Sequence, residues 1–106
     1  MHVIQTDRTP NCYESITVST TAIGFTLAEI KPNTGIFKDM ECHEVFCTLE
    51  TASIRYCVDG TTATTDVGHL VSAGQTITIR NKESIKNFSA YRDATTDGVL
   101  KVTFFF

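Results

Sequence analysis

Five side chains in the middle of the chain are of the types that bind metals or act as nucleophiles: Cys42, His43, Cys47, Cys57 and His69. A structural zinc site usually takes two of its ligands from a Cys-x-x-Cys turn, and this sequence contains none. Cys42 and Cys47 lie an odd number of residues apart on one expected strand, so their side chains should point to opposite faces. The spacing therefore disfavours a metal site and predicts ordinary thiols.

A second chemical possibility is nucleophilic catalysis by Cys57 with His69 as its base, because a junction between a strand and a loop could bring the two together. Other catalytic signatures are missing: the sequence has no glycine-rich phosphate loop, no serine elbow and no paired carboxylates on one face. Asp93 and Asp97 lack the ligand alternation of a calcium loop. We therefore expect no enzymatic activity and no cofactor, and we interpret His69 as a loop histidine bonded to the backbone.

Length and charge narrow the remaining classes of protein. A chain of 106 residues forms one domain with a real core. A net charge of −3, with scattered lysines and arginines, disfavours nucleic acid as a partner. The apolar runs are far shorter than the roughly 20 residues that span a bilayer, and the first residues do not resemble an export signal. We expect a soluble protein made in a reducing cytosol, whose four cysteines stay free, with no membrane partner.

The elements that must position these side chains are strands. Abundant Thr, Val and Ile and frequent turn signals predict an all-β fold, a single-domain antiparallel β-sandwich of about seven to eight strands, Ig-like or jelly-roll-like. Residues 15–106 should form this sandwich, and residues 1–14 an N-terminal arm. Strands are expected within residues 15–29 (bent or broken at Gly24), 40–50, 53–58, 76–80, 85–92 and 99–106. A helix is possible only near residues 25–30 or 82–86.

Alternation assigns faces to some of these strands. Ile54, Tyr56 and Val58 should face the core, which turns Arg55 outward, toward either an acidic residue on a neighbouring strand or a partner. Ile77 and Ile79 should also point inward. The segment 40–50 has mixed residues on both faces, so neither is clearly the core face.

The C-terminal strand ends in three phenylalanines, which cannot all share one face. We expect Leu100, Val102, Phe104 and Phe106 to fill the core and Phe105 to lie on the opposite face with Val99. An exposed aromatic ring on an edge strand favours a contact with another subunit. The sequence therefore predicts an interface, and a homo-oligomer, with these candidate residues: Phe105, Val99, Arg55 and Tyr13.

The run ETASIRYCVDGTTATTDVGHLVSAGQTITI, residues 50–79, resembles a recurring small β-rich protein of tailed bacteriophages and prophages. The shared features are an Arg-aromatic strand, Asp-Gly-Thr, a Thr-rich link, Gly-His, an Ala-Gly turn and an alternating strand. A weaker likeness extends over most of residues 14–106. The sequence departs at residues 62–64, where a proline is expected, and at Gln75, where an acidic residue is usual.

This resemblance implies a virion-associated structural protein, made in the cytoplasm of a bacterial host. The role we expect is a capsid decoration or cement protein that binds the major capsid protein or another virion protein. The alternative is a tail or fibre accessory module that binds a receptor or a glycan. The sequence has no tryptophan for stacking on sugars, which disfavours the alternative.

Overall fold

The protein is a two-layer β-sandwich. The computed structural model describes residues 8–93 and 95–106, and within them it has seven strands and two short helices. The strands are β1 (Pro10–Val18), β2 (Glu44–Glu50), β3 (Ile54–Cys57), β4 (His69–Val71), β5 (Thr76–Ile79), β6 (Ser89–Arg92) and β7 (Gly98–Phe105), and the helices are α1 (Leu27–Ile30) and α2 (Lys82–Lys86). The predicted all-β sandwich is confirmed, with short helices at both expected places.

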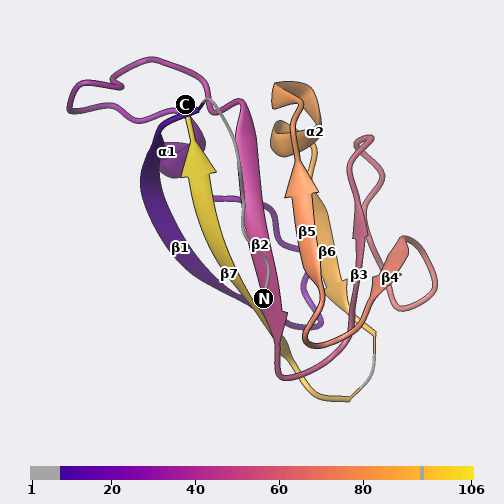
Figure 1. Cartoon of the computed structure of the whole chain (residues 1–106). Helices are drawn as coiled ribbons and strands as arrows, with labels where there is room; N and C mark the ends of the chain where they lie inside the picture. Colours follow the sequence, from indigo (N-terminus) through magenta and orange to yellow (C-terminus); the bar gives the residue numbers. More distant parts are fainter. Residues whose placement is uncertain (1–7, 94) are drawn as a thin grey trace.

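All the described strand pairs are antiparallel, and they form two sheets. One sheet has the order β1-β7-β2-β5 and the other the order β4-β3-β6. Figure 1 shows the four-stranded sheet on one side and β3 and β4 continuing past β5 on the other. Both helices and the C-terminus lie at the same end of the sandwich.

The core lies between the sheets and follows the period-two alternation of the strands. On β7, Leu100, Val102 and Phe104 are all buried and face inward, as predicted. On β3, Ile54 is buried and Tyr56 packs against the core cluster. On β2, the inner face is formed by Val45, Cys47 and Leu49, whose side chains are almost completely buried. Their burial resolves the ambiguity that the sequence left in this strand.

The chain segment after β1 crosses from one sheet to the other and covers the edge of β6. Ile23 and Ala90 exchange two backbone hydrogen bonds of 3.0 and 2.8 Å, and the amide of Arg92 donates to the carbonyl of Ser19 at 3.1 Å. The free edge that β6 would otherwise present is therefore occupied.

The helix α2 begins and is anchored by polar contacts. The side chain of Asn81 accepts hydrogen bonds from the amides of Glu83 at 2.9 Å and Ser84 at 3.2 Å, as a helix N-cap does. Glu41, just before β2, pairs with Lys82 at 3.2 Å and Lys86 at 2.9 Å. These pairs fix the helix to the segment that enters the four-stranded sheet.

Three expectations are wrong in detail. The strand β1 begins at Pro10 and pairs with β7 from that point, so residues 10–14 belong to the sandwich and not to an arm. The first seven residues lie outside the described part of the chain. His69 begins β4, whereas the sequence predicted a loop there. The pair Asp97-Gly98 is typical of a turn with a positive φ, but Gly98 lies in β7 without one. Glycine is needed there because an added Cβ would lie 2.6 Å from Cγ2 of Ile54.

Phe105 lies on the predicted face of its strand but is not exposed as predicted. It does stand on the outer face of β7, opposite Phe104, but it is only 5 % exposed. Its ladder neighbours on that face are Pro10 of β1 and Glu44 of β2, and Glu44 is buried as well. The alternation was right, but β7 lies between β1 and β2 and is not the expected edge strand, and the ring of Phe105 is buried and not exposed.

Candidate functional site

Residues 58–68, the threonine-rich part of the motif, connect β3 to β4 and begin with a tight turn. Gly60 has a φ of 94°, which favours glycine. The carboxylate of Asp59 accepts a hydrogen bond from the amide of Thr61 at 3.0 Å. This bond, followed by the Thr61 hydroxyl and the charge of His69, lowers the pKa of the Asp59 carboxyl. The Asp-Gly-Thr sequence therefore builds a turn in which hydrogen bonds favour the ionised form of the Asp59 carboxyl.

The middle of the loop lies over the outer face of β3 and β6. The amide of Ala63 donates to the hydroxyl of Ser89 on β6 at 3.0 Å, and Ala63 is fully buried. Cys57, on the outer face of β3, is buried in the same region. A connection that reads as polar and solvated in the sequence therefore packs onto the sheet through one small apolar residue.

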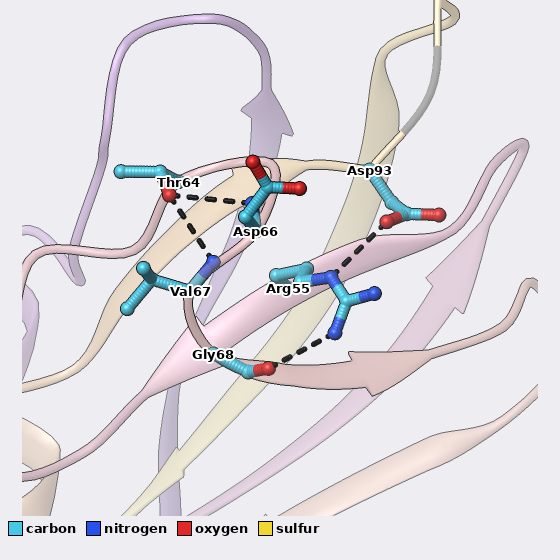
Figure 2. Close-up of polar contacts among 6 residues, drawn as sticks. All are labelled: Arg55, Thr64, Asp66, Val67, Gly68 and Asp93. Carbon is cyan, nitrogen blue, oxygen red and sulfur yellow. Dashed lines mark hydrogen bonds and ion pairs between the residues drawn. The ribbon is translucent and has the colours of Figure 1, made fainter.

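The second half of the loop is closed by Thr64. Its hydroxyl accepts hydrogen bonds from the amides of Asp66 at 3.3 Å and Val67 at 3.1 Å, as Figure 2 shows. Its own amide donates to the carbonyl of Val67 at 3.0 Å. Threonine suits this position because its short hydroxyl can replace a backbone partner.

Gly68 ends the loop and lies against the backbone of β3. It has a φ of 127°, and a Cβ on it would lie 2.9 Å from the carbonyl oxygen of Tyr56. Both the conformation and the contact exclude a side chain. The Gly-His pair in the sequence thus marks the point where the chain enters β4.

Arg55 joins three segments around this loop. Its Nε lies 3.1 Å from Oδ1 of Asp93, which follows β6, and its Nη1 donates to the carbonyl of Gly68 at 3.2 Å (Figure 2). Both partners of the ion pair are half-buried. Of the two alternatives for Arg55, the pairing with an acidic residue is the one observed. The charge of Arg55 is therefore used within the chain, and its place at an interface stays a prediction.

Cys57 and His69 both line one open hollow. This open hollow, of about 370 Å³, is lined by Cys57, Val58, Asp59, Thr61, Val67, Gly68 and His69. His69 is the ladder partner of Tyr56, so its side chain lies on the opposite side of β3 from that of Cys57. No hydrogen bond between the two side chains is found among the described residues. The hollow offers a carboxylate, an imidazole and a hydroxyl, which suit polar contacts better than nucleophilic attack.

A second open hollow, of about 350 Å³, adjoins the first at Val58. It is lined by residues of β3, β5 and the start of α2: Tyr56, Val58, Thr78, Ile79, Arg80, Asn81 and Ser84. The ring of Tyr56 stands between those of Phe88 at 5.8 Å and His69 at 5.6 Å. The two hollows share Val58 and therefore lie next to each other along β3.

The candidate metal ligands are dispersed over the fold. Cys47 is in the core on β2, where burial raises the pKa of its thiol to about 12. Burial also raises the pKa of the Cys42 thiol, which lies 3.3 Å from the carbonyl oxygen of Phe105. Within residues 8–93 and 95–106, no group of three or more His, Cys, Asp or Glu side chains is arranged to hold a metal ion. All four cysteines are free thiols.

Two of the predicted interface residues lie on one surface. Tyr13, which is 62 % exposed, and Val99, which is half-buried, are on the outer face of the four-stranded sheet, on the adjacent strands β1 and β7. Arg55 lies in the other sheet, and Phe105 is buried on the outer face. Whether Tyr13 and Val99 contact another molecule stays a prediction.

The sequence reasoning missed a set of exposed apolar side chains near the C-terminal end of the sandwich. Ile36 is 89 % exposed and Leu27 is 71 % exposed, and Met40 is also exposed. Ile36 and Met40 belong to the loop between α1 and β2, which projects beyond the four-stranded sheet (Figure 1). The sequence does contain a sign that Ile36 is exposed. Ile36 directly follows the turn sequence Asn33-Thr34-Gly35 and is not part of an alternating strand pattern.

Comparison with known proteins adds no relative: no family model, no curated protein and no solved structure matches the chain. In the described part of the chain, none of the helices has the length and apolar character needed to cross a membrane.

Proposed function

We propose that the protein is a non-enzymatic structural protein of a bacteriophage particle, a capsid decoration protein that binds the major capsid protein. The proposal rests on what the structure does with the residues that resemble the phage proteins, which lie within residues 50–79. Arg55, Asp59, Thr64 and Gly68 are all engaged in shaping the β3–β4 connection. A motif that specifies a loop and a fold supports kinship with small structural proteins more than kinship with enzymes.

The surface of the molecule offers places for such contacts. Ile36 and Leu27 are exposed at one end of the sandwich, and Tyr13 is exposed on the outer face of the four-stranded sheet. Burial of a large apolar side chain contributes about 1.5–3 kcal/mol. Modest contacts of this kind, repeated around the symmetry axes of a shell, add up to stable attachment.

The direct test is to purify virions from a host that carries the gene and to search them for this protein by mass spectrometry. We expect the protein in stoichiometric amounts with the major capsid protein. Its absence from intact particles would contradict the proposal. Gold-labelled antibody on the same particles then distinguishes the shell from the tail.

One observation favours a second candidate, a tail or fibre module that binds a glycan. The hollow at the Thr-rich loop presents Asp59, Thr61 and His69 around an open space, and such mixed donors and acceptors suit sugar hydroxyls. Saturable binding on a glycan array, lost in Asp59→Ala, would place this candidate first. An array without specific signal would contradict this second candidate.

A further inference from the structure

The free edge of β5 differs from the other three edges of the sandwich, because each of those is obstructed. The edge strand β1 starts with Pro10, has an irregular register between Pro10 and Cys12, and turns Glu14 toward α1, where it bonds Thr26. The edge of β6 is covered by the segment at Ile23. The strand β4 has only three residues. Prolines, bulges, inward charges and short strands are the usual ways in which proteins protect sheet edges.

In the described part of the chain, β5 shares only shortness with these edges, since it has four residues. Its sequence, Thr76–Ile79, contains no proline, no charge and no bulge in its pairing with β2. The amide of Leu49 donates to the carbonyl of Gln75 at 3.0 Å, which sets the phase of the antiparallel ladder. Because bonding groups alternate along such a ladder, Ile77 and Ile79 bond to β2, whereas Thr76 and Thr78 turn their amides and carbonyls toward the free edge.

The layer opposite this edge is also incomplete. His69 faces the same side as its ladder partner Tyr56, which is the side of the four-stranded sheet, yet His69 is exposed. The reason is that the four-stranded sheet ends at β5 while the other sheet continues to β4 (Figure 1). An open hollow beside this edge is lined by Tyr56, Val58 and Thr78, among others.

We propose that the edge of β5 is an acceptor site for one extended segment of a partner protein, which adds an antiparallel strand beside β5 and over His69. The amides and carbonyls of Thr76 and Thr78 supply the backbone hydrogen bonds. One apolar side chain of the segment enters the hollow against Tyr56 and Val58. The proposed site is the same whether the protein belongs to the head or to the tail of a particle.

The positive charge beside β5 determines which residue type the bound segment should carry at its flank. Arg80 follows β5 directly, and its side chain is 69 % exposed with one long contact, 3.7 Å, to Glu44. Lys82, two residues further on, is already paired with Glu41. An acidic residue in the segment beside Arg80 therefore completes the recognition, so that the expected ligand alternates an apolar residue with an acidic one.

A second copy of this chain does not fit the site. Two-fold pairing of β5 with β5 would place the partner's three-stranded sheet over the same space that β3 and β4 fill, because that sheet extends past β5 in each copy. An extended segment has no second layer and avoids this overlap. The occupant is thus a single strand of another protein.

The test uses a displayed library of random peptides of about ten residues, the length of a long strand. Selection on the whole chain is followed by counter-selection on Thr78→Pro, which removes the outward amide and leaves the bonds to β2 in place. Thr78→Val is the matched control, because it keeps that amide. Selected peptides should carry alternating apolar and acidic residues, and Thr78→Pro should weaken their binding about tenfold or more, while Thr78→Val should not.

A second readout locates the peptide on the structure. In hydrogen exchange followed by NMR, the amide of Thr78 should become protected when a selected peptide is bound, and Arg80→Glu should shift selection from acidic to basic residues. Thr78→Pro must keep the wild-type spectrum elsewhere, which shows that the fold is intact. The proposal is overturned if no peptide survives counter-selection, if Thr78 stays unprotected, or if sedimentation shows a dimer that Thr78→Pro abolishes.

Discussion

Two long loops of this chain, residues 58–68 and residues 31–43, differ in how closely they pack onto the sandwich. In each loop the packing is the reverse of what its composition suggests. The first is rich in threonine, but its centre is buried through Ala63 and tied by side chains such as Arg55 and Thr64. The second contains Ile36, Phe37 and Met40, yet it leaves Ile36 almost fully exposed. The comparison teaches that specific hydrogen bonds and glycine positions, more than hydrophobicity, decide which loop packs onto the sandwich.

The projecting loop is not loose at its base. The ring of Phe37 lies 5.2 Å from that of Phe106, and the amide of Asp39 donates to the carbonyl of Pro32 at 2.8 Å. Glu41 then ties the end of the loop to α2. It is therefore a braced projection that holds its apolar tip away from the core, a form that suits contact with another molecule.

The largest effect is expected where the packed loop touches the sheet. Gly68→Ala forces a side chain into a positive φ and against the backbone of Tyr56, which should lower the free energy of unfolding by about 3 kcal/mol. Gly60→Ala is the matched control: its φ is also positive, but open space surrounds it, so about 1 kcal/mol is expected. Urea denaturation measures both. Equal losses would mean that the close approach of Gly68 to β3 is unimportant.

Arg55→Met should have the next largest effect, because it removes a charged hydrogen bond and an ion pair while it keeps most of the aliphatic contact. The pair is half-buried, so we expect a loss of about 1–2 kcal/mol, together with faster proteolysis within residues 58–68. Arg80→Met, at a mostly exposed side chain, should change stability by less than about 0.5 kcal/mol. If both variants unfold alike, Arg55 does not hold the loop.

The sequence was informative where local alternation decides the structure, and uninformative where distant segments do. The inward faces of β3 and β5 follow directly from Ile54, Ile77 and Ile79. The face of Phe105 was also correct, but its exposure was not, and its ladder neighbours, Pro10 and Glu44, come from two other strands. Alternation within one strand contains no information about such neighbours.

In the candidate site, too, the local sequence predicts some features and distant segments determine the others. Asp59-Gly60 is a typical turn pair, and glycine at position 68 permits conformations that a Cβ would oppose; both glycines have a positive φ. The partners of Arg55 and the packing of Ala63 under the loop arise from β6, which is far away in the sequence. The open space beside β5 depends on the relative extent of two sheets, a property of topology that no local pattern records.

The brace of the projecting loop should depend on pH. Hydrogen bonds from Lys86 and then Lys82 lower the pKa of the Glu41 carboxyl from 4.5 to about 2. Since the folded pKa lies below the unfolded one, this stabilisation is present above about pH 4.5 and is lost as the pH falls toward 2. Glu41→Gln should therefore be less stable than the parent near neutral pH and should approach it in acid. Urea midpoints for the two proteins across this range check it, and a constant difference would contradict it.

The smallest effect on stability is expected at the tip of the projection. Ile36 is 89 % exposed, so Ile36→Asp removes almost no buried surface and should change the free energy of unfolding by less than about 0.5 kcal/mol. Phe37→Ala is the contrasting variant, because its ring contacts Phe106 and its loss should cost about 1–2 kcal/mol. If the projection attaches the protein to a phage shell, Ile36→Asp should fold normally but fail to join particles in a sedimentation assay. An Ile36→Asp protein that joins particles as well as the parent would show that attachment uses another surface, with Tyr13 and Val99 as the next candidates.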